Sequence, residues 1–217
     1  MSMDKTKAGR RRVVMGLAAA AVIAGAGVAL APKPAQAVQS GAAAPAFQVV
    51  DAAGRTRSLE EFAGKTVVLE WTNDQCPFVK KHYDSGNMQA LQREAAAAGA
   101  VWLSVISSAP GKQGHVTGAQ ANQLSASRNA APTAILLDAS GDVGRLYGAR
   151  TTPHMYVISP DRRVVYQGAI DDKPSADRAT LTGARNYVRE ALTAVRAGRA
   201  PAVAAAPPYG CSIKYAG

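Results

Sequence analysis

Nearly continuous apolar runs alternate along the chain with segments whose apolar residues recur at helical spacing. The runs and their flanking turn residues predict strands at 47–51, 66–72, 101–106, 133–137, 154–158 and 163–167. Helical spacing and end signals predict helices at 77–98 (broken or kinked near Ser85-Gly86), 119–128, 142–147 and 176–197. Helices that alternate with buried strands indicate an α/β domain whose central sheet is covered on both faces. The last two strands form a hairpin that adds an antiparallel edge and makes the predicted sheet mixed.

Residues 1–37 have the three-part pattern of an export signal. Basic side chains from Lys5 to Arg12 precede an uncharged stretch at 13–31, and Ala35-Gln36-Ala37 supplies a small-x-small cleavage site. The run Arg10-Arg11-Arg12 resembles a twin-arginine signal, although the usual Ser or Thr before it is missing, so the translocon stays open. The alternative is an uncleaved anchor that leaves the domain facing the periplasm, because nineteen residues just span a bilayer.

This pattern divides the chain into four predicted parts. A signal peptide (1–37) precedes a flexible lead-in (38–45), an α/β domain (46–199) and a tail (200–217) that carries Cys211. We expect the protein to be exported to the periplasm by a twin-arginine or Sec signal and to have no stable membrane insertion after the signal is cleaved.

Charge gives little support for nucleic-acid binding. The formal net charge is +10, but residues 1–37 contribute half of it, and residues 38–217 hold 19 basic and 14 acidic side chains without a basic block. In an oxidising compartment the two cysteines indicate either a disulfide or redox chemistry.

Cys76 lies where a predicted buried strand and a polar loop lead into a helix. Pro77 fits the first helical turn, where its missing N–H is not needed. Unpaired N–H groups and the helix dipole at that point favour a thiolate, and Lys80 and Lys81 follow within about one turn. The alternative is an inert buried cysteine.

Two further positions stand out. Glu70 interrupts an apolar strand six residues before Cys76, and a buried carboxyl there is suited to proton transfer. Alternatively, Glu70 faces an edge and pairs with Lys65 or Lys173. Thr152-Pro153 precedes the predicted hairpin, and an X-Pro bond at such a place has access to the cis form.

These features resemble the thioredoxin superfamily over residues 46–197, with the extra helix and strand typical of its peroxiredoxin-like and TlpA-like branches. The segment from Trp71 to Tyr83 and the tail Tyr209–Tyr215 are similar to bacterial redoxins of those branches. The resemblance implies a thioredoxin-like fold and a thiol-disulfide oxidoreductase or a peroxiredoxin-like antioxidant. It implies that Cys76 attacks, that Pro153 is a cis-proline whose neighbour Thr152 pairs with substrate, and that Glu70 exchanges protons with the thiols.

The chain departs from both standard motifs. Val79 stands where thioredoxins have their second cysteine, and Leu69 and Asn73 replace the proline and threonine that precede the peroxiredoxin cysteine. Thr72, one residue before Asn73, is a candidate to take the place of that threonine if the loop shifts. Cys211 is the candidate resolving thiol because the linker 200–208 is long enough to bring it back to the domain. The alternatives are a permanent structural disulfide and a free Cys211.

The partners expected are protein thiols or disulfides, or small peroxides, together with an unidentified electron donor. No cofactor and no metal are expected. His82 and His154 near Cys76 leave a copper-handling protein as a less favoured alternative, because Lys80 occupies the place of a second cysteine ligand. His154 is otherwise a surface residue or packs on the active-site helix. A different class of function is a non-catalytic module that docks partners along the cis-proline groove.

Overall fold

The computed structural model describes residues 1, 3 and 38–217, so the predicted export signal at 1–37 lies outside the described residues apart from Met1 and Met3. Among the described residues no helix is long and apolar enough to cross a membrane.

The strands follow the predicted apolar runs closely. Their bounds are β1 (Gln48–Val50), β2 (Thr56–Ser58), β3 (Val67–Trp71), β4 (Val101–Ile106), β5 (Ala134–Leu137), β6 (Thr151–Thr152), β7 (His154–Ile158), β8 (Val164–Gly168), β9 (Ala205–Ala206) and β10 (Cys211–Ser212). The 3-10 helices are η1 (Leu59–Phe62) and η2 (Arg178–Leu181), and the α-helices are α1 (Pro77–Asp84), α2 (Asn87–Ala97), α3 (Gly118–Ser127), α4 (Asp142–Tyr147) and α5 (Tyr187–Arg196).

The central sheet has six strands in the order β5-β4-β3-β7-β8-β9. Strands β3, β4 and β5 are parallel, whereas β7 is antiparallel to both β3 and β8. The predicted mixed sheet is therefore confirmed. The hairpin does not form an outer edge, however, because β7 lies directly beside β3 and β9 of the tail extends the sheet beyond β8.

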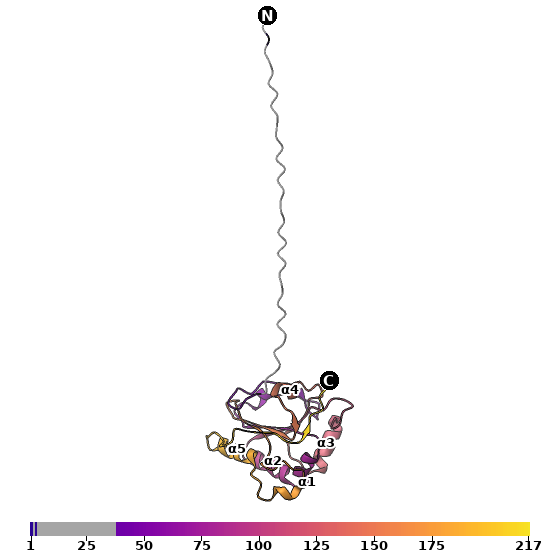
Figure 1. The fold of residues 1–217 in the computed structure, drawn as a ribbon, viewed down its shortest axis with the longest axis vertical. Coiled ribbons are helices and arrows are strands. Elements are labelled where there is room, and N and C mark those ends of the chain that lie inside the picture. The colour runs from indigo at the N-terminus through magenta and orange to yellow at the C-terminus, as the bar shows by residue number, and fades with distance from the viewer. Residues whose placement is uncertain (2, 4–37) are drawn as a thin grey trace. The chain divides into compact units, whose positions relative to one another are not determined.

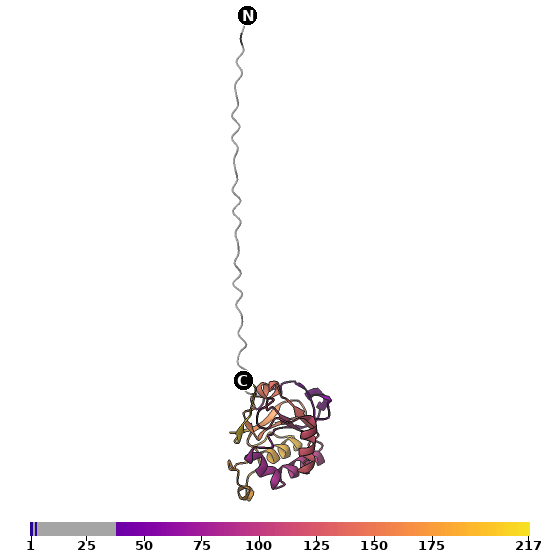
Figure 2. The ribbon, with the colours of Figure 1, turned by 90° about the vertical axis from the view of Figure 1, so that its right-hand side faces the viewer.

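Helices cover both faces of this sheet. Figure 1 places α4 on one side and α5, α2 and α1 on the other, and Figure 2 shows the same two-sided arrangement from a second direction. Side chains of β3 alternate between the two cores: Leu69 and Trp71 pack with Tyr147 of α4, whereas Val68 packs with Cys76 and the helices of the opposite layer. Burial on both faces explains why β3 is an almost unbroken apolar run.

One predicted helix is interrupted where expected, and another differs from the structure. The break predicted near Ser85-Gly86 is confirmed: the helix at 77–98 is divided into α1 and α2 at Gly86, whose φ of +76° a helix interior does not tolerate. The single helix at 176–197 is wrong in its first half: Gly183 has a φ of +70°, and Asn186 caps a new helix by accepting the Arg189 N–H. The apolar spacing across 176–197 did not reveal this interruption.

Both flanking segments are bound to the domain. Residues 38–45, predicted as a flexible lead-in, donate backbone hydrogen bonds from Gly41 to Val164 and from Ala44 to Arg162. The tail contributes β9 to the central sheet and β10 to a separate pair with β6. The reason is that apolar residues in both segments, including Val38 and Ile213, pack against the core formed with α4.

Candidate active site

Cys76 is the residue that caps the N-terminus of α1, immediately after the loop that follows β3. Pro77 occupies the first turn, as predicted. Asn73 shapes the loop, because its side-chain oxygen accepts the Gln75 N–H (2.9 Å) and its backbone oxygen accepts the Cys76 N–H (3.1 Å). The cysteine is fully buried. Its thiol therefore lies at a helix start but is shielded from solvent.

The peptide bond between Thr152 and Pro153 is cis. The Thr152 carbonyl oxygen accepts a hydrogen bond from the Cys76 thiol at 3.1 Å. The β6 segment thus lies directly against the start of α1, and the structure brings together three of the residues singled out from the sequence.

The tail brings the second cysteine to the same place. Strand β10 pairs antiparallel with β6, so that Cys211 lies opposite Thr152. Gly210 makes the approach possible: its φ is +134°, and a Cβ at this position would clash with the Thr152 carbonyl oxygen. Beyond the pair, the Ile213 N–H donates to the Arg150 carbonyl (3.0 Å) and holds the tail along this edge. Both cysteines are free thiols in the structure.

The surroundings of the two thiols shift their pKa values in opposite directions. Burial on its own would raise the pKa of Cys76, but hydrogen bonds from the Cys211 thiol and from the N–H groups of Val79 and Cys211 outweigh it and lower the pKa. Burial, together with its bond to Cys76 and the charge there, raises the pKa of Cys211 to about 11. The arrangement therefore favours a thiolate at Cys76 and a protonated donor at Cys211.

Glu70 is buried beneath α1 and α2 and does not face an edge. Its carboxyl accepts hydrogen bonds from four side chains: Tyr83 (2.8 Å), Gln92 (3.4 Å), Trp102 (2.8 Å) and Ser104 (3.0 Å). Pairing with Lys65 or Lys173 is therefore wrong. Burial raises the pKa of Glu70, although these four donors oppose the rise. No hydrogen bond joins the carboxyl to either cysteine among the described residues.

A family model described as the AhpC/TSA family matches residues 40–167, which is more than half of the chain. The chain belongs to the AhpC/TSA family. No curated protein matches it. With the fold above, the match makes the chain a redoxin of the thioredoxin superfamily.

Two solved structures share the fold of this AhpC/TSA-family redoxin over most of its length, and a third matches a smaller part of it. A hypothetical protein from Sinorhizobium meliloti is 24% identical with a TM-score of 0.70, over 83% of this chain and 97% of its own. An uncharacterized conserved protein from Geobacillus kaustophilus is 24% identical with a TM-score of 0.71, over 82% and 92%. A putative thiol:disulfide interchange protein DsbE from Chlorobium tepidum is 22% identical with a TM-score of 0.49, over 60% and 85%.

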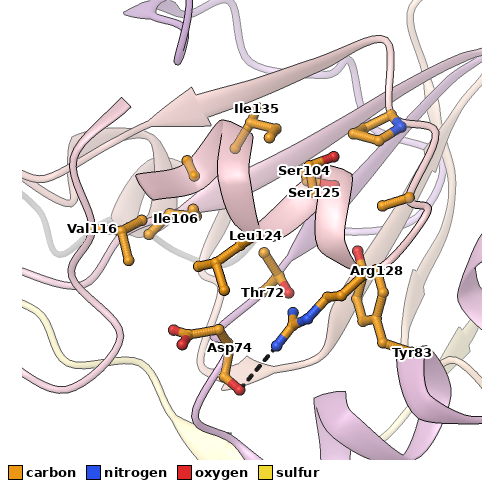
Figure 3. A pocket seen from close by; sticks show the side chains of 13 residues that line it. Thr72, Asp74, Tyr83, Ser104, Ile106, Val116, Leu124, Ser125, Arg128 and Ile135 are labelled. Carbon is orange, nitrogen blue, oxygen red and sulfur yellow. Dashed lines mark hydrogen bonds between the residues drawn. The ribbon is translucent and has the colours of Figure 1, made fainter. Parts of the chain in front are cut away.

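Thr72 does not fill the place of the missing peroxiredoxin threonine in this family member. Its hydroxyl is buried without a hydrogen-bond partner, so it makes no bond to Cys76. Instead Thr72 lines a cavity beside α3 with Asp74 and Arg128, whose guanidinium donates to the Asp74 carbonyl at 3.2 Å (Figure 3). Tyr83 and Ser104, two of the donors to Glu70, line the same cavity (Figure 3).

The lysines after Cys76 differ from the prediction. Lys81, predicted as a cation near the thiol, is buried on another part of α1, 3.5 Å from the Asp171 carboxylate. The pKa of Cys76 is lowered by hydrogen bonds at the helix start, and Lys81 is not among the groups that lower it.

Both histidines of interest are buried and neutral. His154 is not a surface residue: its Nδ1 accepts the Arg150 N–H (3.2 Å), and burial lowers its pKa to about 3. Burial likewise lowers the pKa of His82 to about 4. Within the residues that the structure describes, no three His, Cys, Asp or Glu side chains gather as a metal site.

The sequence reasoning missed Tyr209 and Asp171. Tyr209 lies two residues before Cys211, and its hydroxyl donates to the carboxylate of Asp171, which follows β8. The signal in the sequence was an aromatic residue close to Cys211, at the end of a tail segment otherwise rich in Ala and Pro. Asp171 had no recognisable signal, because its partners come from α1 and the tail.

Proposed function

We propose that this chain is a thiol-dependent reductase in which Cys76 attacks an oxidant and Cys211 resolves the product. The observation that carries the proposal is that Thr152 lies opposite Cys211 across β6 and β10 while its carbonyl oxygen accepts a hydrogen bond from the Cys76 thiol, so the two cysteines meet at one residue. The lowered pKa of Cys76 and the raised pKa of Cys211 support the same roles, with one thiol suited to attack and the other protonated.

The proposed cycle begins with a hydroperoxide. The Cys76 thiolate attacks the terminal oxygen, the O–O bond breaks, and the alcohol or water leaves after taking a proton, so that Cys76 becomes a sulfenic acid. The Cys211 sulfur then displaces the sulfenic oxygen, which leaves as water, and a Cys76–Cys211 disulfide forms. Two thiol equivalents from an external electron donor reduce this disulfide and restore both thiols.

A small oxidant fits this site better than a protein disulfide. The edge of β6 beside Pro153, on which an extended protein substrate would pair, is already paired with β10. Cys76 is fully buried beneath it. A protein disulfide would have to displace the tail, whereas a peroxide needs only a local opening. The occupied edge also argues against a module that docks partners there.

Four further residues have proposed roles around Cys76. Thr152 supplies the carbonyl that holds the thiol before attack, and Pro153 fixes the β6 segment beside it. Pro77 starts the helix whose N–H groups stabilise the thiolate. Glu70 exchanges protons with solvent through Tyr83 and Ser104, which reach the cavity of Figure 3.

The proposed location is the periplasm, because residues 1–37 have the pattern of a cleaved export signal. Fractionation of cells that produce the full chain, with the N-terminus of the product sequenced, tests this. A mature protein that begins near Val38 in the periplasmic fraction supports export.

The experiment on function follows the two chemical steps separately. The protein is treated with one equivalent of hydroperoxide, and peroxide consumption, sulfenic acid trapped by a dimedone-type reagent and disulfide are measured by mass spectrometry. The wild type should form the Cys76–Cys211 disulfide, and a dithiol should reverse it. Cys211→Ser should accumulate sulfenic acid at Cys76, and Cys76→Ser should not react. An equal rate of peroxide consumption in Cys76→Ser would refute the proposal, as would a disulfide that dithiol leaves unreduced.

A further inference from the structure

A second group of buried polar side chains lies on α1, away from Cys76. Lys81 and His82 of this helix meet Asp171, and all three are buried. The Lys81 ammonium is 3.5 Å from the Asp171 carboxylate and donates to the Lys173 carbonyl at 2.8 Å. Because burial lowers the pKa of His82 to about 4, its ring is neutral and the group holds one buried ion pair.

Tyr209 of the tail completes this group. Its hydroxyl donates to the Asp171 carboxylate and lies 3.4 Å from His82 Nε2. Its ring lies beneath the Lys81 ammonium, which is 5.4 Å from the ring centre, and meets Phe78 edge-on at 5.9 Å. Burial raises the pKa of Tyr209, with help from Asp171, so the phenol stays protonated and remains a donor. We call these five residues, Phe78, Lys81, His82, Asp171 and Tyr209, the tail anchor.

The tail anchor fixes the tail relative to the attacking thiol. Phe78, Lys81 and His82 belong to the same helix that Cys76 caps, and Tyr209 is two residues from Cys211. A hydrogen bond from a phenol to a buried carboxylate is charge-assisted and stronger than a neutral one. If Tyr209 leaves, the buried carboxylate of Asp171 loses a hydrogen bond that water does not replace, which costs free energy. The cluster therefore favours the docked position of Tyr209.

We infer that Tyr209 is a positioning residue for the resolving step, in which its docking on α1 holds Cys211 within reach of Cys76. This inference rests on the proposed function. The residue touches neither the oxidant nor the reacting sulfur atoms, and it acts only by keeping the tail in place while the disulfide closes.

The test measures how often the tail opens and how fast the Cys76–Cys211 disulfide forms after oxidation. Backbone hydrogen exchange at Ile213, whose N–H is bonded to Arg150, reports opening of the tail. In Tyr209→Phe this exchange should accelerate about ten- to a hundredfold, the range for loss of one hydrogen bond to a charged group. In Tyr209→Ala, which also loses the ring, closure of the disulfide after oxidation should slow at least about tenfold. The rate of sulfenic acid formation per Cys76 thiolate should not fall, because an open tail uncovers the buried Cys76 and does not remove any group that reacts with the oxidant.

Tyr215→Phe is the matched control. It also removes a tail hydroxyl, one that donates to the neutral Ala149 carbonyl at 2.8 Å, and it should accelerate exchange only about two- to tenfold. Equal acceleration in Tyr209→Phe and Tyr215→Phe, or an unchanged closure rate in Tyr209→Ala, would overturn the inference while leaving the proposed function intact. A wild type that forms sulfenic acid but no disulfide would overturn the proposed function itself.

Discussion

Thr152 and Cys211 are paired directly across two antiparallel strands, and the carbonyl of the same Thr152 accepts the hydrogen bond of the Cys76 thiol. One residue of β6 thereby contacts both cysteines. Thioredoxins place their second thiol three residues after the first, where this chain has Val79. In the proposed function Cys211 of the C-terminal tail supplies that thiol instead.

The first prediction concerns the acidity of Cys76. Replacing Cys211 with Ala removes the thiol that donates to Cys76. The Cys76 pKa should then rise, because fewer hydrogen bonds oppose the effect of burial. The measurement is the rate of alkylation of Cys76 as a function of pH, with the midpoint as the readout. Cys211→Ser keeps a hydroxyl donor and is the matched control, with a smaller rise. A midpoint that falls in Cys211→Ala would mean that the Cys211 thiol does not lower the pKa of Cys76.

The second prediction concerns Gly210. In Gly210→Ala the new Cβ meets the Thr152 carbonyl, and a φ of +134° is unfavourable for alanine. The cost, about 1–3 kcal/mol, acts on the docked tail alone. Hydrogen exchange at the Ile213 amide should accelerate at least about tenfold, and disulfide closure should slow.

Gly183→Ala is the control for Gly210. Gly183 also has a positive φ, +70°, but a Cβ there meets nothing within 4 Å. It should destabilise its own loop and leave exchange at Ile213 unchanged. If the two variants had equal effects on Ile213, the close approach of β10 to β6 would not be what Gly210 permits.

The third prediction concerns the loop before Cys76. Asn73→Ala removes the side-chain oxygen that accepts the Gln75 N–H, so the loop before α1 should loosen and the free energy of unfolding should fall by about 1 kcal/mol, the contribution of one ordinary hydrogen bond. Denaturant unfolding measures the loss. Asn73→Asp keeps the acceptor and should restore most of the stability. A loss in Asn73→Asp as large as in Asn73→Ala would mean that the acceptor oxygen is not what stabilises the loop.

Much of the fold was predictable because burial determines which residue types a segment needs, and this can be recognised in the local sequence. Buried on both faces, β3 and β4 need apolar side chains at almost every position, and the runs at 66–72 and 101–106 reveal them without knowledge of their neighbours. Pro77 after Cys76 likewise marks a helix start locally. The cysteine at a strand-to-helix junction could therefore be placed from the sequence.

The rest depends on contacts between distant residues. Nothing local distinguishes Glu70 facing an edge from Glu70 surrounded by Trp102, Tyr83 and Ser104, because the donors come from other elements. The interruption before α5 depends on Gly183 and the Asn186 cap, which the apolar spacing of 176–197 conceals. The tail anchor is hidden for the same reason, since Tyr209 and Asp171 are 38 residues apart.

The last prediction concerns the buried carboxyl of Glu70. Its folded pKa is raised by burial above the ordinary value of 4.5. The folded state therefore binds the proton more tightly than the unfolded state, and the stability gained from it is complete below about pH 4.5 and is lost as the pH rises through the folded pKa. Glu70→Gln cannot titrate, and its amide group turns a donor toward Trp102 or Gln92, which are themselves donors to this residue. At pH 4.5 the variant should be less stable by about 1–3 kcal/mol.

The difference in the free energy of unfolding between the wild type and Glu70→Gln should then narrow steadily from pH 4.5 upward, because only the wild type loses stability there. Urea unfolding at several pH values measures it. Glu94→Gln is the control: Glu94 forms an exposed pair with Arg189, and its replacement should cost under about 1 kcal/mol. A difference that widens with pH would mean that the four hydrogen bonds to Glu70 outweigh its burial. The carboxyl would then be held as a permanent anion and could not exchange protons with the site.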